Sequence, residues 1–538
     1  MKSTKLTYIK NILLPCLIFS VITGICTGIF IFLFKNAAAY VCRLSENVFS
    51  YLHSHPSAFL PVFFISLGIG LLISLILTFA KDCRGGGIPT SVAILRGLID
   101  FNWIKSVFIL FISAMLTYLC GIPLGTEGPG VQMGTALGRG TAKILGKKNT
   151  AWDRYIMTGG ACAGFACATG APVTGIMFAF EEAHRRFSPM IFMAASMTVI
   201  SGCATNELLC QISGTSSYLF NIKIDYSLPL KYLLCVLTVG IICGICAILF
   251  TKLYRIIGIF VREKLKKIPL PVKIMAVSGA TCLSGFAFCE CIGTGHSLTE
   301  AILEGHGVWY MLILYFCIRA ILLIFASRVG VSGGLFVPSL TFGAIIGSVC
   351  AQAMTYAGIL PAKYHVIITV VGMVSFLGAS ARTPITAVIF ALEVLGCIGN
   401  ILPIAMGVTF AFLVIEVVGV PSFNDTVIES KVESANRDKV ATIVNTNITV
   451  AHGSFAVGKE IRDILWPPTC TVLSVQKNPN SEERSPSGLS EGDILHVHYQ
   501  TYDPSLTYEK LEAIVGVQSS VPKMKTHTTD KNHSVPEL

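Results

Sequence analysis

Charged side chains are scarce in this chain: 13% of its 538 residues are Asp, Glu, Lys or Arg, whereas 53% are hydrophobic. A soluble domain carries about 25% charged residues, so the composition excludes an ordinary soluble protein. Charge-free runs at 11–34, 59–80 and 232–251 are each long enough to cross a bilayer, which takes about 20 apolar residues. We therefore predict a membrane protein with at least three spans.

Motifs of catalysis and metal binding are also missing. No Ser, His and Asp cluster resembles a hydrolytic site, and the CxxC pair of Cys243 and Cys246 lies inside an apolar run without a second pair at ligand spacing. Most of the nineteen cysteines stand singly in apolar segments, which predicts buried free thiols rather than a disulfide framework. We expect neither an enzyme nor a bound metal or cofactor.

Short apolar pieces broken by Gly or Pro fill the interval from about 106 to 418. Lipid tolerates irregular backbone only where it is buried in protein or lines a cavity, and broken helices are typical of transporters. The pattern predicts a transport pathway. The pieces are 107–120, 190–204, 274–289, 309–326, 336–349, 364–378 and 399–415.

The basic residues indicate topology. Lys2, Lys5 and Lys10 precede the first apolar run, which could be read as a signal peptide, but that run exceeds the length of a signal h-region and lacks a small-residue cleavage site. The positive-inside rule places this end in the cytoplasm, together with the basic loop at 252–267. The net charge of +10 therefore reflects topology and not nucleic-acid binding.

The chain contains an internal duplication. GTEGPGVQMGTALG (125–138) aligns without gaps on GLFVPSLTFGAIIG (334–347), and PVTGIMFAFEE (172–182) aligns on PITAVIFALEV (384–394). Two pairs of segments in the same order predict two related halves of roughly 200 residues, as in transporters that bind their substrate where two repeats meet. The alternative is that glycine and proline simply recur in membrane helices.

Three segments, GGGIP (85–89), GTEGP (125–129) and GLFVP (334–338), each run from glycine into a proline that suits the first turn of a helix. Helix N-termini carry partial positive charge and free amides, so three that converge would bind an anion without a full positive charge. In that order, on a duplicated membrane body, they resemble the signature segments of the CLC chloride channel and transporter family over about residues 1–430.

The resemblance implies roles for two glutamates. Glu127, in GTEGP, matches the gating glutamate, whose carboxylate competes with the anion and swings away when protonated. Glu182 matches the internal glutamate that passes protons to the gate in family members that exchange anions for protons. Glu181, which repeats as Glu393, is the better candidate for a structural role.

The chain also departs from the family pattern. Gly86 stands where the family usually has an anion-binding Ser, Phe423 where it has a Tyr, and Thr126 where a Lys or Arg precedes the gate. We expect the remaining donors to be backbone amides, and a central site that binds anions more weakly or less selectively. The anion-binding residues that we predict are Gly85, Gly86, Gly128, Leu335, Phe336, Val337 and Phe423.

The composition turns polar after about residue 429. A linker at 431–439 precedes β-forming segments at 440–450, 469–475 and 493–500, with a helix expected at 459–465. GSFAVGK (453–459) has P-loop spacing, but Glu460 follows it where magnesium binding needs Ser or Thr. Residues 440–517 resemble the RCK C-terminal (TrkA-C) module, which implies a cytoplasmic dimerisation or ligand-sensing domain. We expect 518–538 to be disordered.

These observations predict an all-α polytopic membrane protein of CLC type, with inverted repeats and broken or re-entrant helices, followed by a small cytoplasmic α/β domain. By resemblance it is a homodimeric transporter of inorganic anions, exchanging chloride for protons in a prokaryotic plasma membrane, with both termini cytoplasmic. A cyclic dinucleotide is one possible ligand of the C-terminal domain, and no nucleic-acid partner is expected. The alternatives are a passive channel, a weakly coupled or fluoride-transporting protein, and a sensor with a degenerate pore.

Overall fold

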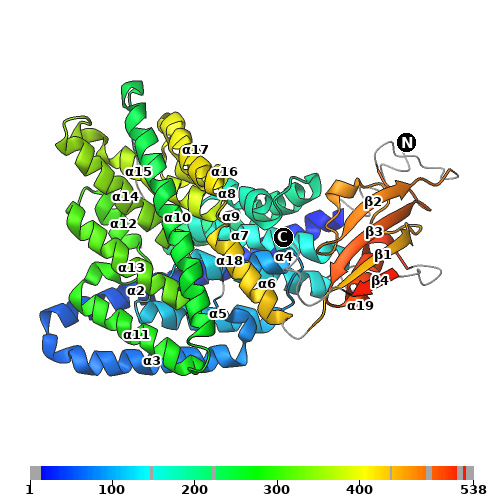
Figure 1. Ribbon diagram of the computed structural model, residues 1–538, viewed down its shortest axis with the longest axis horizontal. Coiled ribbons are helices and arrows are strands. Elements are labelled where there is room, and N and C mark those ends of the chain that lie inside the picture. The colour runs from blue at the N-terminus through cyan, green and yellow to red at the C-terminus, as the bar shows by residue number, and fades with distance from the viewer. Residues whose placement is uncertain are drawn as a thin grey trace.

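A helical body carries a small β-sheet domain at one end (Figure 1). The computed structural model describes residues 14–85, 87–145, 150–220, 224, 226–436, 439–479, 488–517 and 525–528. The helices of the body are α2 (Leu14–Ser54), α3 (Phe59–Phe79), α4 (Ile88–Leu95), α5 (Trp103–Leu119), α6 (Glu127–Leu145), α7 (Asp153–Thr169), α8 (Pro172–Phe178), α9 (Pro189–Ser213), α10 (Leu233–Glu263), α11 (Leu270–Ala287), α12 (His296–Leu303), α13 (Trp309–Val329), α14 (Phe336–Tyr356), α15 (His365–Ala381), α16 (Pro384–Val394), α17 (Ile401–Val418) and α18 (Phe423–Ala435).

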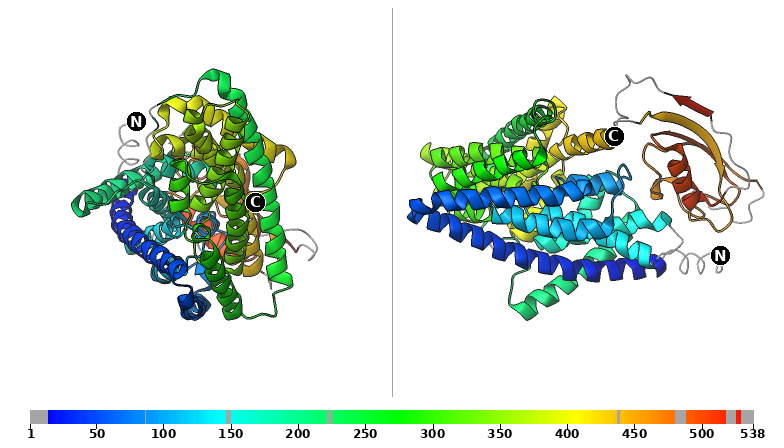
Figure 2. Two further views of the ribbon diagram at one scale, coloured as in Figure 1. Left: turned by 90° about the vertical axis from the view of Figure 1, so that its left-hand side faces the viewer. Right: turned by 90° about the horizontal axis from the view of Figure 1, so that it is seen from below.

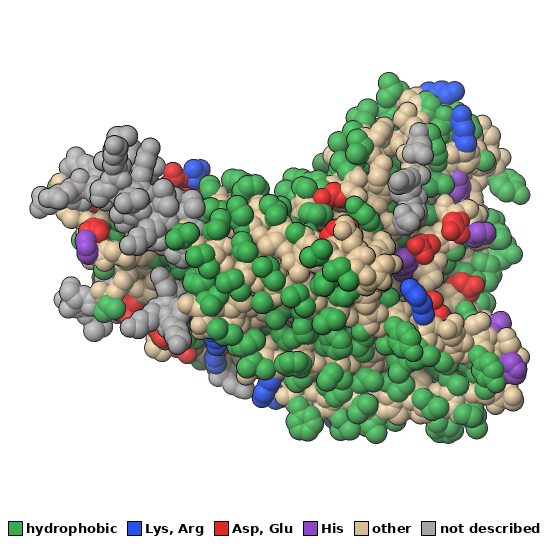
Figure 3. Space-filling model, turned by 180° about the vertical axis from the view of Figure 1, so that it is seen from behind, with side chains coloured by type: hydrophobic (Ala, Val, Ile, Leu, Met, Phe, Trp, Pro, Cys, Tyr) green, Lys and Arg blue, Asp and Glu red, His purple; other side chains and the backbone are tan. Residues whose placement is uncertain are grey.

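The body is a multi-span membrane fold. Among the described residues, eight helices are long and apolar enough to cross a bilayer: α2, α3, α10, α11, α13, α14, α15 and α17. The spans of α3, α10, α15 and α17 include the short 3-10 turn that precedes each helix. Hydrophobic side chains cover the middle of the body, and most charged side chains on the visible face lie toward its ends (Figure 3). The three predicted spans are confirmed, although α2 continues to Ser54 instead of ending near residue 34. The shorter apolar pieces are helical as well.

Glycines that recur in the two repeats allow the same close packing in each half. A Cβ on Gly134 of α6 would lie 2.1 Å from the Gly160 carbonyl oxygen of α7, and a Cβ on Gly343 of α14 would lie 2.5 Å from that of Gly372 in α15. Both distances are far shorter than a normal contact, so each pair of backbones meets only because side chains are missing. The matched contacts confirm the duplication.

The C-terminal domain is a four-stranded antiparallel sheet with strand order β2-β3-β1-β4 and a helix, α19 (Pro504–Val515). Its strands are β1 (Thr442–Thr449), β2 (Thr471–Gln476), β3 (Ile494–Thr501) and β4 (Lys525–Thr528). Figure 2 shows the sheet at the end of the body where α2 begins. The three predicted β segments are confirmed.

The helix expected at 459–465 is wrong: the structure has a single 3-10 turn at Ile461–Asp463. The carbonyls that follow this turn are used by the body instead of by a helix. Arg186 donates to the Ile464 carbonyl at 2.9 Å, and Arg154 donates to the carbonyls of Leu465 and Trp466 at 3.0 and 2.7 Å. Contacts with the body thus replace the local hydrogen bonds of a helix.

Lys459, the lysine of the P-loop-like stretch, is turned into the domain. It is 4% exposed, donates to the Phe455 carbonyl and lies 3.5 Å from the centroid of the Phe455 ring. Burial lowers its pKa to about 7. A lysine held in this way does not reach a phosphate, which agrees with the rejection of a P-loop.

Three other boundaries and burial predictions differ from the structure. Helix α18 runs to Ala435, five residues into the expected linker, and Lys431 donates to the Arg84 carbonyl of the body at 2.9 Å. In the tail expected to be disordered, the structure describes only Lys525–Thr528, which pairs antiparallel with β1. All nineteen cysteines are free, as predicted, but Cys26 and Cys317 are exposed on outward faces of helices.

Candidate functional site: a convergence of helix ends

The glycine-rich segments before α4, α6 and α14 meet at one point. The segments before α6 and α14 pair as a short antiparallel bridge, in which Gly125 N–H donates to Gly334 O at 2.8 Å and Gly334 N–H donates to Gly125 O at 2.7 Å. A Cβ on Gly128 would lie 2.6 Å from the Gly334 Cα and 3.2 Å from the Gly87 Cα. The convergence therefore depends on glycine in all three motifs.

Glu127 is the first residue of α6 and is completely buried. Its Oε1 accepts a hydrogen bond from the Thr126 hydroxyl at 2.8 Å. Its Oε2 is also buried and has no hydrogen-bond partner among the described residues. The helix dipole stabilises a charged carboxylate at a helix N-terminus, whereas the unpaired buried oxygen costs free energy. The two effects on the charged form of Glu127 therefore oppose each other.

Two basic side chains that interact electrostatically with Glu127 were missed from the sequence. They are Lys35 of α2 and His296 of α12, the second only when its imidazole is protonated. Both bind one segment of backbone: Lys35 Nζ donates to the Ser217 carbonyl at 2.6 Å, and His296 Nε2 lies 2.5 Å from the Leu219 carbonyl oxygen. Lys35, with His296 when protonated, supplies positive charge that Thr126 lacks. Their distance along the chain from GTEGP left no signal in the sequence.

The anion donors predicted in α14 are available. Among the described residues, the amides of Leu335, Phe336 and Val337 make no hydrogen bond, as expected for the first turn of a helix. The amide of Gly128 in the first turn of α6 is likewise unbonded within that set. These four N–H groups therefore remain predicted anion donors.

The prediction for the first motif is partly wrong. Gly85 N–H donates to the Gly330 carbonyl at 2.8 Å, so it does not serve as an anion donor in this conformation. Gly87 N–H donates to the side-chain oxygen of Gln132 at 2.7 Å, a contact that the sequence did not reveal. Gly86 lies outside the described residues. The N-terminus of α4 therefore offers fewer donors than its glycines suggested.

A small cavity lies beside the N-termini of α4, α14 and α18. Leu335, Phe336, Phe423 and Glu182 are all among its lining residues. Phe423, the first residue of α18, is 3% exposed and its ring packs near those of Phe250 and Tyr254. The structure thus brings Glu182, two residues of α14 and Phe423 onto one cavity, and its wall at Phe423 has no hydroxyl.

Glu182 lies in a π-helical turn, Ala179–Ala183, that continues α8. Its Oε1 accepts a hydrogen bond from the Asn424 side chain, and Arg96 donates to its backbone carbonyl at 3.0 Å. Asp425 pairs with Arg185 at 2.6 Å and also lies 3.8 Å from Arg96, the arginine that donates to the Glu182 carbonyl. Single π turns occur often at functional sites, because they change the direction in which a side chain points.

Glu181 and Glu393 join the two repeats. The carboxylate of Glu181 accepts hydrogen bonds from the amides of Ile385 and Thr386 at the start of α16, at 2.8 and 2.7 Å. The carboxylate of Glu393 accepts the equivalent bonds from Val173 and Thr174 at the start of α8, at 2.7 and 2.8 Å. Each repeat caps a helix of the other, which confirms the structural role expected for this pair.

Comparison with known proteins identifies the class. The family model described as voltage gated chloride channel matches residues 68–416, and the chain belongs to this family. It is 25% identical over 435 residues to the H(+)/Cl(-) exchange transporter ClcA of Salmonella arizonae, covering 80% of this chain and 91% of that protein. Membership in this family places the chain among multi-pass membrane transport proteins and not among enzymes.

Solved structures share the fold. A slow cyanobacterial Cl-/H+ antiporter superposes with a TM-score of 0.72 at 24% identity, covering 78% of this chain and 99% of that chain. A CLC-type fluoride/proton antiporter superposes with a TM-score of 0.63 at 18% identity, covering 74% of this chain and 95% of that chain. The CLC-like helical fold with a small C-terminal sheet region is therefore established.

Proposed function

We propose that this protein exchanges chloride for protons across a membrane, with Glu127 as the gate and Glu182 as the internal proton-transfer group. The observation that carries the proposal is the burial of Glu127 at the start of α6, together with the position of Glu182 on the cavity beside the α14 N-terminus. The similarity to proteins named as Cl-/H+ exchangers supports the same activity.

The arrangement couples the two ions through one carboxylate. When it is charged, the Glu127 carboxylate lies at a helix N-terminus and is stabilised by the partial positive charge there. An anion would otherwise bind at the same place. A proton removes that charge, releases the side chain and leaves the amides of Gly128, Leu335, Phe336 and Val337 to a chloride ion. Because the same site takes either the carboxylate or chloride, proton and anion move in alternation.

The central site holds its anion weakly in this proposal. Phe423 supplies no hydroxyl, and the Gly85 and Gly87 amides are bonded elsewhere. A hydrogen bond to a charged group contributes about 1.5 to 3 kcal/mol, so fewer donors loosen both chloride binding and coupling. Fluoride/proton exchange is a second candidate, because the fold is shared with a fluoride/proton antiporter. A passive anion channel transfers no protons and would not need an internal acid such as Glu182.

The wider setting belongs to the proposal too. We place the protein in a prokaryotic plasma membrane as a homodimer, with both termini cytoplasmic and one ion pathway in each subunit. The C-terminal domain serves as a cytoplasmic regulatory module of RCK C-terminal type, for which a cyclic dinucleotide is a candidate ligand. Its support is the sheet and helix at 442–515 and the bonds from Arg154 and Arg186 that attach it to the body.

Flux in proteoliposomes tests the activity. Vesicles loaded with chloride and diluted into chloride-free buffer should release chloride and take up protons together, recorded with a chloride electrode and a pH electrode. Fluoride-loaded vesicles form the parallel arm. Chloride release without any proton movement would identify a channel, and proton movement with fluoride alone would favour the second candidate.

A further inference from the structure

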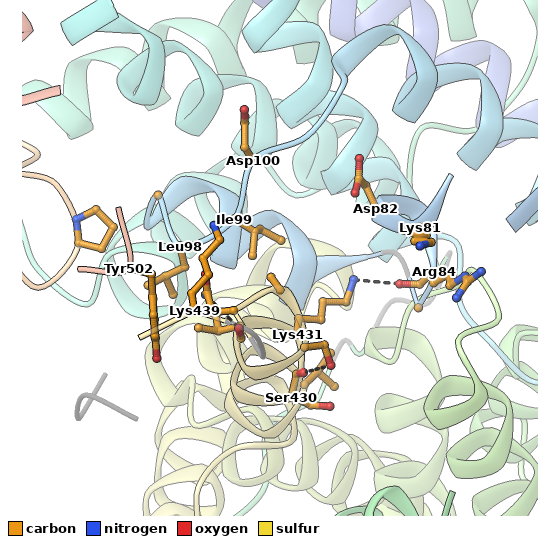
Figure 4. A pocket seen from close by; sticks show the side chains of 18 of the residues that line it. Lys81, Asp82, Arg84, Leu98, Ile99, Asp100, Ser430, Lys431, Lys439 and Tyr502 are labelled. Atoms are coloured by element: carbon orange, nitrogen blue, oxygen red, sulfur yellow. Dashed lines mark hydrogen bonds between the residues drawn. The ribbon is translucent and has the colours of Figure 1, made fainter. Parts of the chain in front are cut away.

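A large cavity lies between the membrane body and the C-terminal domain. Its volume is about 760 Å³, within the range of about 300 to 1,000 Å³ typical of small-molecule sites. The body contributes the segments around Arg84 and Leu98 and helix α18, and the domain contributes the end of β3 and the start of α19. Figure 4 shows Lys439 and Lys431 between Tyr502 on one side and Arg84 on the other.

The lining is strongly cationic. Seven Lys or Arg residues line the cavity against three Asp residues, a surplus of four positive charges. Two of the three carboxylates are already engaged: Asp100 pairs with Arg139, and Asp503 caps α19 by accepting from Leu506 N–H at 3.1 Å. Among the cations, Arg262 is likewise paired, with Glu433 at 2.5 Å, and the lining as a whole remains positive.

Several of these cations are free to bind. The side-chain ammonium groups of Lys81, Lys439 and Lys510 make no hydrogen bond or ion pair within the described ranges of the chain. Lys510 lies in α19 of the domain, Lys439 in the segment between α18 and β1, and Lys81 between α3 and α4, so the cations come from both sides of the cavity. Basic side chains around a cavity of this size favour phosphate groups, and the Tyr502 ring offers a surface on which a base can stack.

The walls of the cavity lead directly to the anion site. Gly85 and Arg84 line it and immediately precede α4, while Lys431 of α18 donates to the Arg84 carbonyl and to the Thr90 hydroxyl. Across the same junction, Arg154 donates to the Leu95 carbonyl at the end of α4 and to two carbonyls of the domain. A ligand here would therefore hold the domain against helices that begin at the transport site.

We infer that this cavity binds a soluble phosphate-bearing anion of nucleotide size, which bridges the C-terminal domain and the membrane body. The inference deepens the regulatory role proposed for the domain, and it rests on that role but not on chloride/proton exchange. A lipid headgroup also carries phosphate and could bind the same lysines, so the experiment includes lipid vesicles as a separate probe.

Binding is measured on the full-length detergent-solubilised protein, so the result is independent of transport. ADP and inorganic pyrophosphate are titrated by calorimetry at physiological chloride concentration. The double variant Lys439→Gln/Lys510→Gln should weaken ADP binding about tenfold or more, because each lost cation removes a charge-assisted contact. The charge-matched control Lys264→Gln/Lys266→Gln changes exposed lysines outside the cavity and should leave the affinity unchanged.

Two further measurements make the test decisive. Thermal unfolding without ligand should match for both double variants, which shows that the cavity variant is folded, and Tyr502→Leu should weaken ADP binding more than pyrophosphate binding. Absence of binding by both probes, or equal loss in the control variant, would overturn the inference. The inference would also be overturned if phosphatidylglycerol vesicles raised the unfolding temperature of the protein while ADP and pyrophosphate did not. That result would identify a lipid headgroup as the occupant.

Discussion

The two halves of the membrane body fold alike but differ at the residues that carry chemistry. At the offset that aligns the repeats, Glu127 of α6 corresponds to Phe336 of α14, and Glu182 corresponds to Val394. In contrast, Glu181 and Glu393 correspond to each other and make equivalent hydrogen bonds across the repeats. Residues kept in both halves hold the scaffold, and acids present in one half only are candidates for transport.

The difference extends to the backbone. In the second half, α16 remains helical through Val394, whereas the first half changes from α8 to a π turn over Ala179–Ala183. The irregular turn coincides with the acid that has no counterpart. The first half therefore departs from the shared design at Glu182 itself.

The largest effect is expected where the two halves touch. Gly128→Ala places a Cβ 2.6 Å from the Gly334 Cα, with backbone on both sides and no flexible side chain to move. We expect this substitution to lower the free energy of unfolding by more than about 4 kcal/mol, which is exceptional for a single residue. Little folded protein should then remain. Gly334→Ala should do the same, and size-exclusion chromatography of the purified protein measures both.

Gly68→Ala is the matched control, because a Cβ at this position in α3 meets nothing within 4 Å. Replacing a helical glycine in open space should be neutral or stabilise by up to about 1 kcal/mol. Equal yields of folded protein from Gly128→Ala and Gly68→Ala would show that the segments do not meet as closely as described.

Glu182→Gln tests the acid without a counterpart. It keeps the hydrogen-bonding oxygen that accepts from Asn424 but removes the titratable group, so proton flux should fall at least about tenfold while chloride flux persists. Paired electrode recordings in proteoliposomes measure both fluxes. Val394→Ala, at the corresponding position of the other half, should leave the ratio of the two fluxes unchanged, and an unchanged ratio in Glu182→Gln would contradict the asymmetry.

The acids shared by both halves should behave as equals. Glu181→Ala and Glu393→Ala each remove the carboxylate that caps the opposing helix, which should lower stability by about 1 to 3 kcal/mol in either case. Thermal unfolding in detergent gives the two values. A large effect for one variant and none for the other would break the equivalence.

The smallest effect is expected at the wall of the cavity. Phe423→Tyr adds a hydroxyl to a ring that lines it, and a donor to a bound anion contributes about 1.5 to 3 kcal/mol, or at least about tenfold in affinity. Calorimetric titration with chloride measures the gain. Phe423→Leu serves as the control for altered packing, and tighter binding by that variant would show that the missing hydroxyl is not the cause.

Much of the fold could be predicted from the sequence, because local patterns of residues determine these features. Apolar runs predicted the membrane helices, and the two pairs of repeated segments predicted the duplication that the Gly125 and Gly334 bridge confirms. Proline near each glycine-rich turn marked the N-termini of α4, α6 and α14. The structural role of Glu181 was predicted from its repetition as Glu393, but the helices that the two carboxylates cap were not predicted.

What could not be predicted depends on contacts between distant segments. Lys35 lies some ninety residues before Glu127 and His296 far after it, so no local pattern in the sequence shows that their charge acts on Glu127. The sequence predicted an anion-binding role for Gly85, but its amide donates to the carbonyl of Gly330, a residue far away in the chain. The irregular, non-helical chain at 464–466 is held by arginines of the body, which its own sequence does not reveal.

The central claim, that anion and proton movement are coupled through Glu127, is tested most directly by uphill transport. Proteoliposomes with an outward chloride gradient and equal pH on both sides should accumulate protons, and Glu127→Gln should abolish that uptake while chloride still crosses. Proton accumulation that persists in Glu127→Gln, or its absence in the native protein while chloride flows, would contradict the claim.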